Sequence, residues 1–289
     1  MRHGLLSVLL VALILAIDSG ITCGQPVASG GAVHTATATA LPSVPPMWAT
    51  PQERPLQFMS KQCNEDAIRV RLAPHPFQRM VAPGVSLALE EGQALLLILA
   101  QDCSEYWIDG QNLGPTQEMH VWLSIEGAKD TRPVVGAEVT RVTMTWFRLF
   151  HGSTNPRART ARTVAGNVET AIEGVSLDVP GPKRGGRVLL TKNLTYSWRA
   201  VSAVPPARVV GINHDVFSKT TTGDIVVDRI QALVHAIASA SQGTLEVTGD
   251  TAMLPWVHAG SYPISVNTFF PIWARGTFGL RTTRSPHLP

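Results

Sequence analysis

The sequence predicts a mainly β fold with two helices, built as a single antiparallel barrel-like domain; a two-sheet sandwich is the alternative architecture. Three observations lead to this fold class. Charged residues make up only 16% of the 289 residues, Pro and Gly are frequent at 21 and 24 residues, and many short segments alternate apolar with polar side chains. Such alternation is typical of strands, and Pro and Gly favour turns. A closed barrel would leave few strand edges unpaired.

The N-terminus has the pattern of an export signal. Arg2 and His3 precede an apolar run over Leu5–Ile17, which is short for a membrane span and typical of the core of a signal peptide. We therefore expect residues 1–23 to be a signal peptide and the protein to be secreted, periplasmic or tethered to the cell envelope. Cys23 is a candidate lipidation site, which would make a lipid anchor the only membrane contact. The alternative is a Cys23 that is removed with the signal or left idle.

Three further segments follow from composition. Residues 24–55 are rich in Ala, Thr and Pro and have few large apolar groups to offset the entropy of ordering, so we expect a disordered tether. Residues 56–281 form the predicted β-rich globular domain, and residues 282–289 a frayed tail. Two cysteines remain in this domain, Cys63 and Cys103. We expect them to form a disulfide after export, with two free buried thiols as the alternative.

The first half of the domain contains four predicted strand features. Ala67–Leu72 alternates as a strand with one buried face, and Val85–Leu89 is a second, short strand. The run Ala94–Ala100 has no polar alternation, so it is buried on both faces or covers a closed core. Asp109-Gly110 indicates a hairpin, and Gly114-Pro115 closes the connection before the next strand.

A strand and a helix are predicted next. Thr140–Phe150 is extended and presents alternate side chains on one face: Val142, Met144, Trp146, Arg148 and Phe150. The first helix lies within His151–Gly166, because Asn155 can cap it and Pro156 suits the first helical position. Three arginines crowd its first turns, where the helix dipole disfavours cations: Arg157, Arg159 and Arg162. One interpretation is that they form a solvated basic face. The alternative is that a bound anion, or a carboxylate from elsewhere in the chain, offsets their charge.

The second half contains the predicted long helix. Arg187–Leu190 and Leu194–Ala200 form a hairpin with Trp198 pointing inward. Asp224–Ser241 is predicted to be helical, because apolar residues recur along it at helical spacing: Val226, Ile230, Leu233 and Ile237. His235 would lie on the opposite, solvent-facing side of that helix. Strands over Thr244–Thr248 and Tyr262–Leu280 complete the domain.

The candidate chemistry lies in the alternating run that ends at Ile125. Glu118, His120, Trp122 and Ser124 share one face, with about 7 Å between the Cα atoms of Glu118 and His120. If this face looks into a barrel, the pair could share a proton, hold a ligand carboxylate or amine, or polarise a carbonyl. The alternatives are that the face looks outward or that His120 is a satisfied core residue. Arg148 lies either at a strand end that reaches solvent or inside the cavity.

Three functions remain open. The first is a binding module whose barrel holds a small, partly apolar ligand in a cavity lined by tryptophans: Trp122, Trp146 and Trp198. The second is an enzyme that uses Glu118 and His120 as acid/base partners, with Arg148 on an oxyanion. The third is adhesion, which would show a filled barrel and an exposed apolar patch.

Several classes are disfavoured. A net charge of +3 is too mild for a nucleic-acid partner. The histidines lack a short-range ligand spacing such as HExxH, so we expect neither a metal nor another cofactor. No GxSxG motif is present, which disfavours a nucleophile-elbow hydrolase. The sequence gives no indication of an oligomeric state.

The order of parts over about residues 85–280 resembles the acetoacetate-decarboxylase superfamily. The shared parts are a strand carrying Glu118, a later basic segment and the run Leu254-Pro255-Trp256-Val257. The resemblance implies an antiparallel barrel with a cavity. That family uses a Schiff-base lysine beside a second lysine, and this chain has no Lys-Lys pair; Lys183-Arg184 is a poor substitute. The resemblance therefore implies the cavity and leaves the decarboxylase chemistry in doubt.

Overall fold

A computed structural model describes residues 55–127, 132–141, 143–178, 183–201, 208–220, 223–252, 254 and 257–281. The expected signal peptide (1–23) with Cys23, the expected tether up to residue 54 and the expected tail (282–289) lie outside these residues. So do Val142 and the Pro255-Trp256 pair. No helix in the described part of the chain is both long and apolar enough to cross a membrane.

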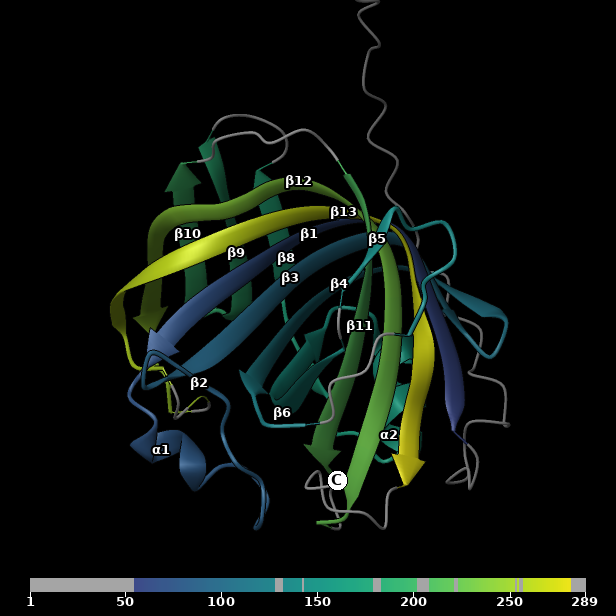
Figure 1. Cartoon of the computed structure of the whole chain (residues 1–289), viewed down its shortest axis with the longest axis horizontal. Coiled ribbons are helices and arrows are strands. Elements are labelled where there is room, and N and C mark those ends of the chain that lie inside the picture. Colours follow the sequence, from purple (N-terminus) through teal and green to yellow (C-terminus); the bar gives the residue numbers. More distant parts are fainter. Residues whose placement is uncertain are drawn as a thin grey trace, which may run out of the picture. The chain divides into compact units, whose positions relative to one another are not determined.

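The centre of the molecule is a closed barrel (Figure 1). Its strands, in spatial order, are β1 (Leu56–Leu72), β3 (Gln93–Ile108), β4 (Gln111–Ser124), β6 (Met144–Ser153), β11 (Arg208–Lys219), β12 (Ile225–Gly249) and β13 (Gly260–Arg281). The pairing of β13 with β1 and of β11 with β12 closes the ring. All neighbours are antiparallel except β6 and β11, which run parallel. The barrel architecture predicted from the sequence is thus confirmed.

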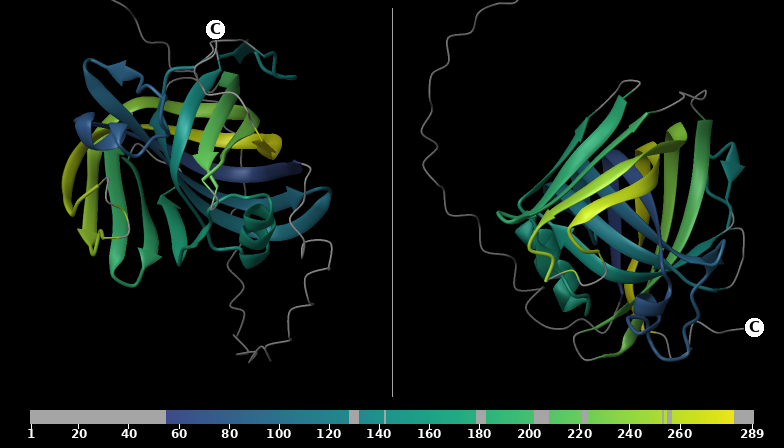
Figure 2. Two further views of the ribbon diagram at one scale, coloured as in Figure 1. Left: turned by 90° about the horizontal axis from the view of Figure 1, so that it is seen from below. Right: turned by 90° about the vertical axis from the view of Figure 1, so that its left-hand side faces the viewer.

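A second layer of sheet continues from the far half of β12 (Figure 2). It contains β10 (Leu194–Val201), β9 (Lys183–Thr191) and β8 (Gly174–Asp178). Three short strands pair elsewhere: β2 (Leu89–Glu90) with β3, β5 (Val139–Thr140) with β11, and β7 (Thr170–Ala171) with β6. One apolar cluster therefore fills the space between the layers, and another lines the barrel lumen.

Strand β3 shows why both layers form. Leu95, Leu97 and Leu99 belong to the cluster in the lumen, whereas Leu96 and Ile98 belong to the cluster between the layers. The absence of polar alternation in this run is explained by burial on both faces, as the sequence predicts. The following turn, Asp109-Gly110, has positive φ at both residues (48° and 78°), which is the geometry of a two-residue hairpin.

The strand alternation is interrupted by β-bulges, which exchange the two faces of a strand. In β1 the register does not shift against β3 or β13, but Gln62, which precedes Cys63, has a left-handed φ of 50°. In β3 the register shifts between Cys103 and Tyr106, and in β6 Leu149 has no partner opposite β4. Because of these shifts, Tyr106 in β3 and His151 in β6 face the lumen. The predicted disulfide lies beside two of these irregularities, since Cys63 follows Gln62 and Cys103 precedes the shift in β3. The two cysteines lie directly opposite each other, with an S–S distance of 2.07 Å.

Helix α2 (Pro156–Val164) is the predicted first helix and covers one end of the lumen. Its start signal is confirmed, because the Asn155 side chain accepts hydrogen bonds from the backbone N–H groups of Arg157 and Ala158. Gly166, at φ 91°, follows its last turn in the left-handed conformation that glycine favours. Ala158 and Ala161 pack into the lumen cluster, which directs Arg162 of the same helix inward.

The predicted long helix over Asp224–Ser241 is wrong; these residues belong to strand β12. The apolar residues whose spacing indicates a helix lie on two different faces of this strand. Ile230 faces the lumen, whereas Leu233 lies on the outer wall beneath Gly136 of the 132–141 segment. His235 is exposed as expected, but as a strand residue.

Three smaller predictions also need correction. Gly114-Pro115 lies inside β4 and does not close a loop. The segment Val85–Leu89 forms only an isolated bridge at Leu87 and the start of β2. The second helix of the fold is α1 (His75–Gln78), a single turn that buries Phe77.

Candidate functional site

The barrel lumen contains two adjacent cavities. The outer chamber has a volume of about 650 Å³ and the inner chamber about 50 Å³. The two share four lining residues, which we call the neck: Glu65, Leu99, Ile212 and His214. A volume of several hundred Å³ is typical of a small-molecule pocket, whereas the inner chamber can hold only a small chemical group.

The outer chamber has apolar walls and a charged rim. Its walls include Leu95, Leu97, Trp146 and Phe269. At the rim, Arg69 contacts Glu90 at 2.6 Å, and both side chains are about one-third exposed (35%). This distribution suits a molecule with an apolar body, because the walls of the chamber are apolar and its charged residues Arg69 and Glu90 pair with each other at the rim.

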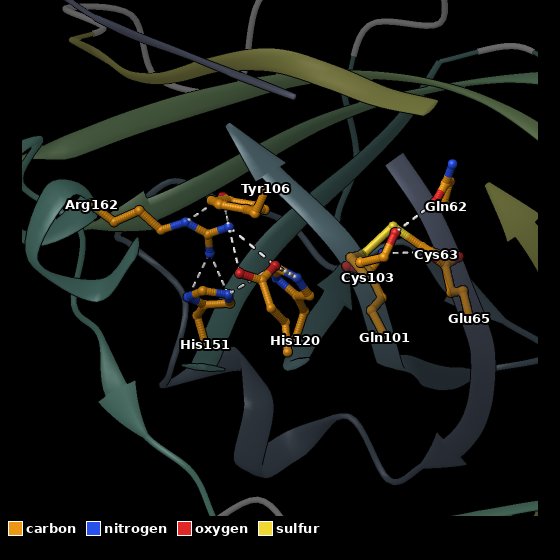
Figure 3. The surroundings of a disulfide bond; sticks show 11 residues. Gln62, Cys63, Glu65, Gln101, Cys103, Tyr106, His120, His151 and Arg162 are labelled. Atoms are coloured by element: carbon orange, nitrogen blue, oxygen red, sulfur yellow. Dashed lines mark hydrogen bonds and ion pairs between the residues drawn. A yellow bond between two sulfur atoms is a disulfide. The ribbon is translucent and has the colours of Figure 1, made fainter. Parts of the chain in front are cut away.

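An ionic cluster forms the back of the inner chamber (Figure 3). Arg162 extends from α2 toward the strands, and its Nη2 lies 3.0 Å and 3.1 Å from the two carboxylate oxygens of Glu118. Its Nε donates to the hydroxyl of Tyr106 at 2.9 Å, and its Nη1 lies 2.8 Å from Nδ1 of His151. His151 also contacts Glu169. One guanidinium therefore links β3, β4, β6 and α2.

Burial and charge fix the protonation of this cluster. Burial opposes ionisation of Glu118, but the Arg162 charge and hydrogen bonds from His120 and His151 outweigh it and hold its pKa well below the usual range. Burial, with the nearby His151, lowers the pKa of His120 well below its usual value. Burial also raises the pKa of Tyr106, whose hydroxyl stays protonated. At neutral pH, Glu118 is an anion and His120 is neutral.

These states define the tautomer of His120. Its Nε2 lies 3.3 Å from Glu118 Oε2, and an ionised carboxylate can only accept a hydrogen bond, so Nε2 carries the proton. The remaining nitrogen, Nδ1, is then a lone-pair acceptor. It is buried and has no hydrogen-bond partner among the described residues, and the indole N–H of Trp122 shares this condition. The residues that line the inner chamber thus include one unpaired acceptor, on His120, and two unpaired donors, on Trp122 and on Nε of Arg148.

Two of the four neck residues, Glu65 and His214, carry titratable groups. Gln101 donates to one carboxylate oxygen of Glu65. Burial raises the pKa of Glu65 to about 7, and this amide hydrogen bond only partly opposes the shift. His214 accepts at Nδ1 from the indole N–H of Trp146 at 2.8 Å, and burial lowers its pKa to about 3. His214 is therefore neutral with its proton on Nε2.

The cluster also has the composition of a metal site. Ligand atoms of Glu118, His120 and His151 all lie within 4.8 Å of one another. Glu118 and His151, however, already contact the guanidinium of Arg162. Arg162 is thus the cation that these groups hold, and a metal would have to displace it.

The structure brings together most of the residues singled out from the sequence. Glu118, His120 and Trp122 line the inner chamber, and Trp146 lines the outer one. Arg148 is buried at the inner chamber and does not reach solvent. It donates hydrogen bonds to Asp228 at 2.7 Å and to Asn167 at 3.0 Å. Its charge is therefore already paired with Asp228, and only its Nε has no hydrogen-bond partner among the described residues.

Trp198 lies apart from the other two tryptophans. It belongs to the cluster between the layers, where its indole N–H donates to Asp66 at 2.8 Å. The expected cavity of three tryptophans is thus reduced to Trp122 and Trp146.

Sequence reasoning missed five residues of the site: Glu65, Tyr106, His151, Arg162 and His214. Two of them, Tyr106 and His151, follow bulges that reverse the alternation. For Arg162 the sequence offered a carboxylate from elsewhere as a partner, although α2 places Arg162 in its last turn, where the helix dipole favours a cation, and not in the first turns as predicted. That carboxylate is Glu118.

No protein-family model matches the sequence, and no curated protein matches it either. Similar solved structures exist. They are acetoacetate-decarboxylase-like proteins. An acetoacetate decarboxylase-like enzyme from Sphingomonas wittichii has a TM-score of 0.49 at 12% identity, over 85% of this chain and 98% of that chain. The enduracididine biosynthesis enzyme MppR with HEPES buffer bound has a TM-score of 0.49 at 12% identity, over 82% of this chain and 90% of that chain. The acetoacetate decarboxylase from Legionella pneumophila has a TM-score of 0.48 at 12% identity, over 80% of this chain and 88% of that chain.

This is the family that the order of parts in the sequence resembles. At this identity and TM-score, the chemistry of the chain has to be argued from its own residues. No described residue that lines either chamber is a lysine. Lys129 and the side chain of Lys183 lie outside the described residues.

Proposed function

We propose that this protein binds a small, partly apolar molecule in the lumen of its barrel. The observation that carries the proposal is the outer chamber of about 650 Å³, which borders at the neck on an inner chamber lined by buried polar groups. An apolar wall gives affinity to such a ligand, and a few polar groups orient it. The chamber also favours binding over adhesion, which would call for a filled barrel.

Export is part of this proposal, with the alternative of a lipid tether at Cys23. The disulfide between Cys63 and Cys103 supports it, because structural disulfides persist in oxidising compartments. The length and flanks of the apolar run Leu5–Ile17 support it from the sequence.

A blocked lumen tests the binding proposal. Ala67 lines the outer chamber, and Ala67→Trp would fill part of it. Thr248→Trp is the matched control, since Thr248 is an exposed residue of β12 that lines neither chamber. In a thermal-shift series of small acids, amines and sterol-like compounds, we expect compounds that stabilise the wild type and the control but not Ala67→Trp. Equal shifts in all three proteins would refute a lumenal site.

Acid–base catalysis is a second candidate function. It is favoured by one observation: His120 donates from Nε2 to Glu118 and leaves Nδ1 without a partner among the described residues. In this arrangement Nδ1 can take a proton while Glu118 stabilises the imidazolium. Arg148 has no part in this candidate, because Asp228 and Asn167 hold it.

Exchange of the α-protons of a small ketone in D2O, followed by NMR, tests catalysis without an assumed product. We expect His120→Asn and Glu118→Gln to lose exchange that the wild type shows above buffer. Wild-type exchange no faster than buffer would remove this candidate and leave the binding proposal intact.

A further inference from the structure

The neck of the lumen indicates which ligands the outer chamber accepts. We propose that Glu65 and His214 bind the oxygen of an uncharged carbonyl compound, such as a ketone, ester or amide, whose apolar body lies in the outer chamber. This inference rests on the proposed binding function and specifies its ligand class.

The first argument is the direction of the hydrogen bonds. The indole N–H of Trp146 can only donate, so His214 accepts it at Nδ1 and presents its other nitrogen as an N–H donor. This Nε2 has no hydrogen-bond partner among the described residues, and His214 lines both chambers. The neck therefore offers a donor that needs an acceptor.

The second argument concerns Glu65, on the same neck. Gln101 occupies one of its carboxylate oxygens, which leaves the other oxygen for the lumen. When protonated, this carboxyl is a second donor, and a buried acid that stays neutral can hold a carbonyl oxygen. Its pKa of about 7 makes that form available at neutral pH.

The third argument is the charge balance of the lumen. The buried cations are paired: Arg162 with Glu118, and Arg148 with Asp228. A ligand carboxylate would therefore find no free buried cation among the described residues and would lie beside Glu65. A ligand ammonium would face the N–H donor of His214 and would be attracted by Glu65 only in the ionised form, which the raised pKa of Glu65 disfavours. An uncharged acceptor meets neither penalty.

The pH dependence of binding follows from the groups around Glu65. Asp66 is adjacent in sequence, and the other ionisable residues of the two chambers are Arg69, Glu90, Tyr106, Glu118, His120, Glu126, Arg141, Arg148, Arg162 and His214. Only the protonated form of Glu65 donates. The dissociation constant should therefore rise about tenfold from pH 6 to pH 8, as Glu65 loses its proton.

Three compounds of matched size test the ligand class by calorimetry: benzylacetone, its carboxylate analogue hydrocinnamate, and the amine that corresponds to benzylacetone. We expect benzylacetone to bind at least tenfold more tightly than the other two. Binding of either charged compound at equal or higher affinity, or no binding of benzylacetone, would overturn the proposal.

Two variants test the role of Glu65. Glu65→Gln keeps an N–H donor without a titrating proton, so benzylacetone should bind it with nearly the same affinity at pH 6 and pH 8. Glu126→Gln, at the exposed rim of the same chamber, is the control and should keep the wild-type pH dependence. A pH dependence that survives in Glu65→Gln would contradict the assignment.

The Ala67→Trp variant separates this inference from the proposed function. If hydrocinnamate binds best and Ala67→Trp abolishes its binding, the lumen is the site and the ligand class is wrong. If benzylacetone binds equally well to Ala67→Trp and to the wild type, the lumenal site itself is refuted, and this inference with it.

Discussion

Single residues in the lumen carry the chemistry of this protein, and each owes its state to its surroundings. Glu118 is a buried carboxylate and Glu65 a half-buried one, and their pKa values move in opposite directions. Arg162 holds Glu118 as an anion, whereas Glu65 has only the neutral amide of Gln101. The same side chain thus becomes a fixed charge at the back of the lumen and a titrating group at its neck.

The raised pKa of Glu65 links folding stability to pH. A carboxyl whose folded pKa, about 7, exceeds its ordinary value of 4.5 favours folding fully below pH 4.5 and progressively loses this contribution as pH rises through 7. Glu65→Gln should therefore gain stability over the wild type at pH 8, by on the order of 1–3 kcal/mol, and show no such gain at pH 4. Urea denaturation at both pH values measures this difference. An equal effect at pH 4 and pH 8 would contradict the linkage.

The buried pair of Glu118 and Arg162 should be strongly coupled. Removing one partner leaves the other charge buried and unpaired, so Arg162→Met should cost about 3–5 kcal/mol. The double variant with Glu118→Gln should cost less than the sum of the two single variants. Arg157→Met, on the same helix, is the control and should change stability by about 0.5 kcal/mol or less. Additive effects in urea denaturation would show that the pair does not act as a unit.

At the scale of elements, helix α2 positions the site because its start is fixed. Asn155 accepts two backbone hydrogen bonds of the helix and donates to the carbonyl oxygens of Leu113 and Pro115 in β4. It therefore both caps α2 and attaches it to the barrel wall.

Asn155→Ala should lower the free energy of unfolding by about 2 kcal/mol, since it removes a cap and two hydrogen bonds to the strand. Thr160→Ala, at an exposed position of the same helix, serves as the control and should cost much less. Chemical denaturation gives both values. A loss no larger than that of the control would show that Asn155 does not hold the helix.

The sequence predicts elements well where one periodicity runs without interruption. The alternation of Glu118, His120 and Trp122 holds along β4, and the cap and proline define α2. Prediction from periodicity fails where a strand is buried on both faces or carries a bulge. In β12, Ile230 and Leu233 are apolar on opposite walls, which imitates the spacing of a helix.

The site could be predicted only in part for the same reason. Glu118 and His120 are two residues apart on one strand, so their contact follows from local geometry. Tyr106 and His151 face the lumen only because bulges in β3 and β6 reverse the faces, and a bulge has no fixed sequence signature. Glu65 and His214 meet at the neck through the closure of the barrel, which brings distant strands together.

At the scale of the whole molecule, the disulfide joins strands β1 and β3, which contribute Glu65 and Leu99 to the neck. Cys63 and Cys103 are 40 residues apart, and closing a loop of this length stabilises the fold by about 4 kcal/mol in the chain-entropy account.

The double variant Cys63→Ala/Cys103→Ala should therefore lower the free energy of unfolding by about 4 kcal/mol in urea denaturation. Reduction of the wild type should produce a similar loss, and Cys63 should resist alkylation in the native, oxidised protein. An alkylatable Cys63 in such material would show that the bond does not form.

The central claim is that the lumen of the barrel binds a ligand, and the indole N–H signals of the tryptophans in an NMR titration test it most directly. With the tightest compound of the thermal-shift series, we expect the signals of Trp122 and Trp146 to shift, because these side chains line the two chambers. The signals of Trp107, which packs under Lys61, and of Trp198, which lies between the layers, should stay in place. Shifts of Trp107 or Trp198 with Trp122 and Trp146 unchanged would contradict the claim.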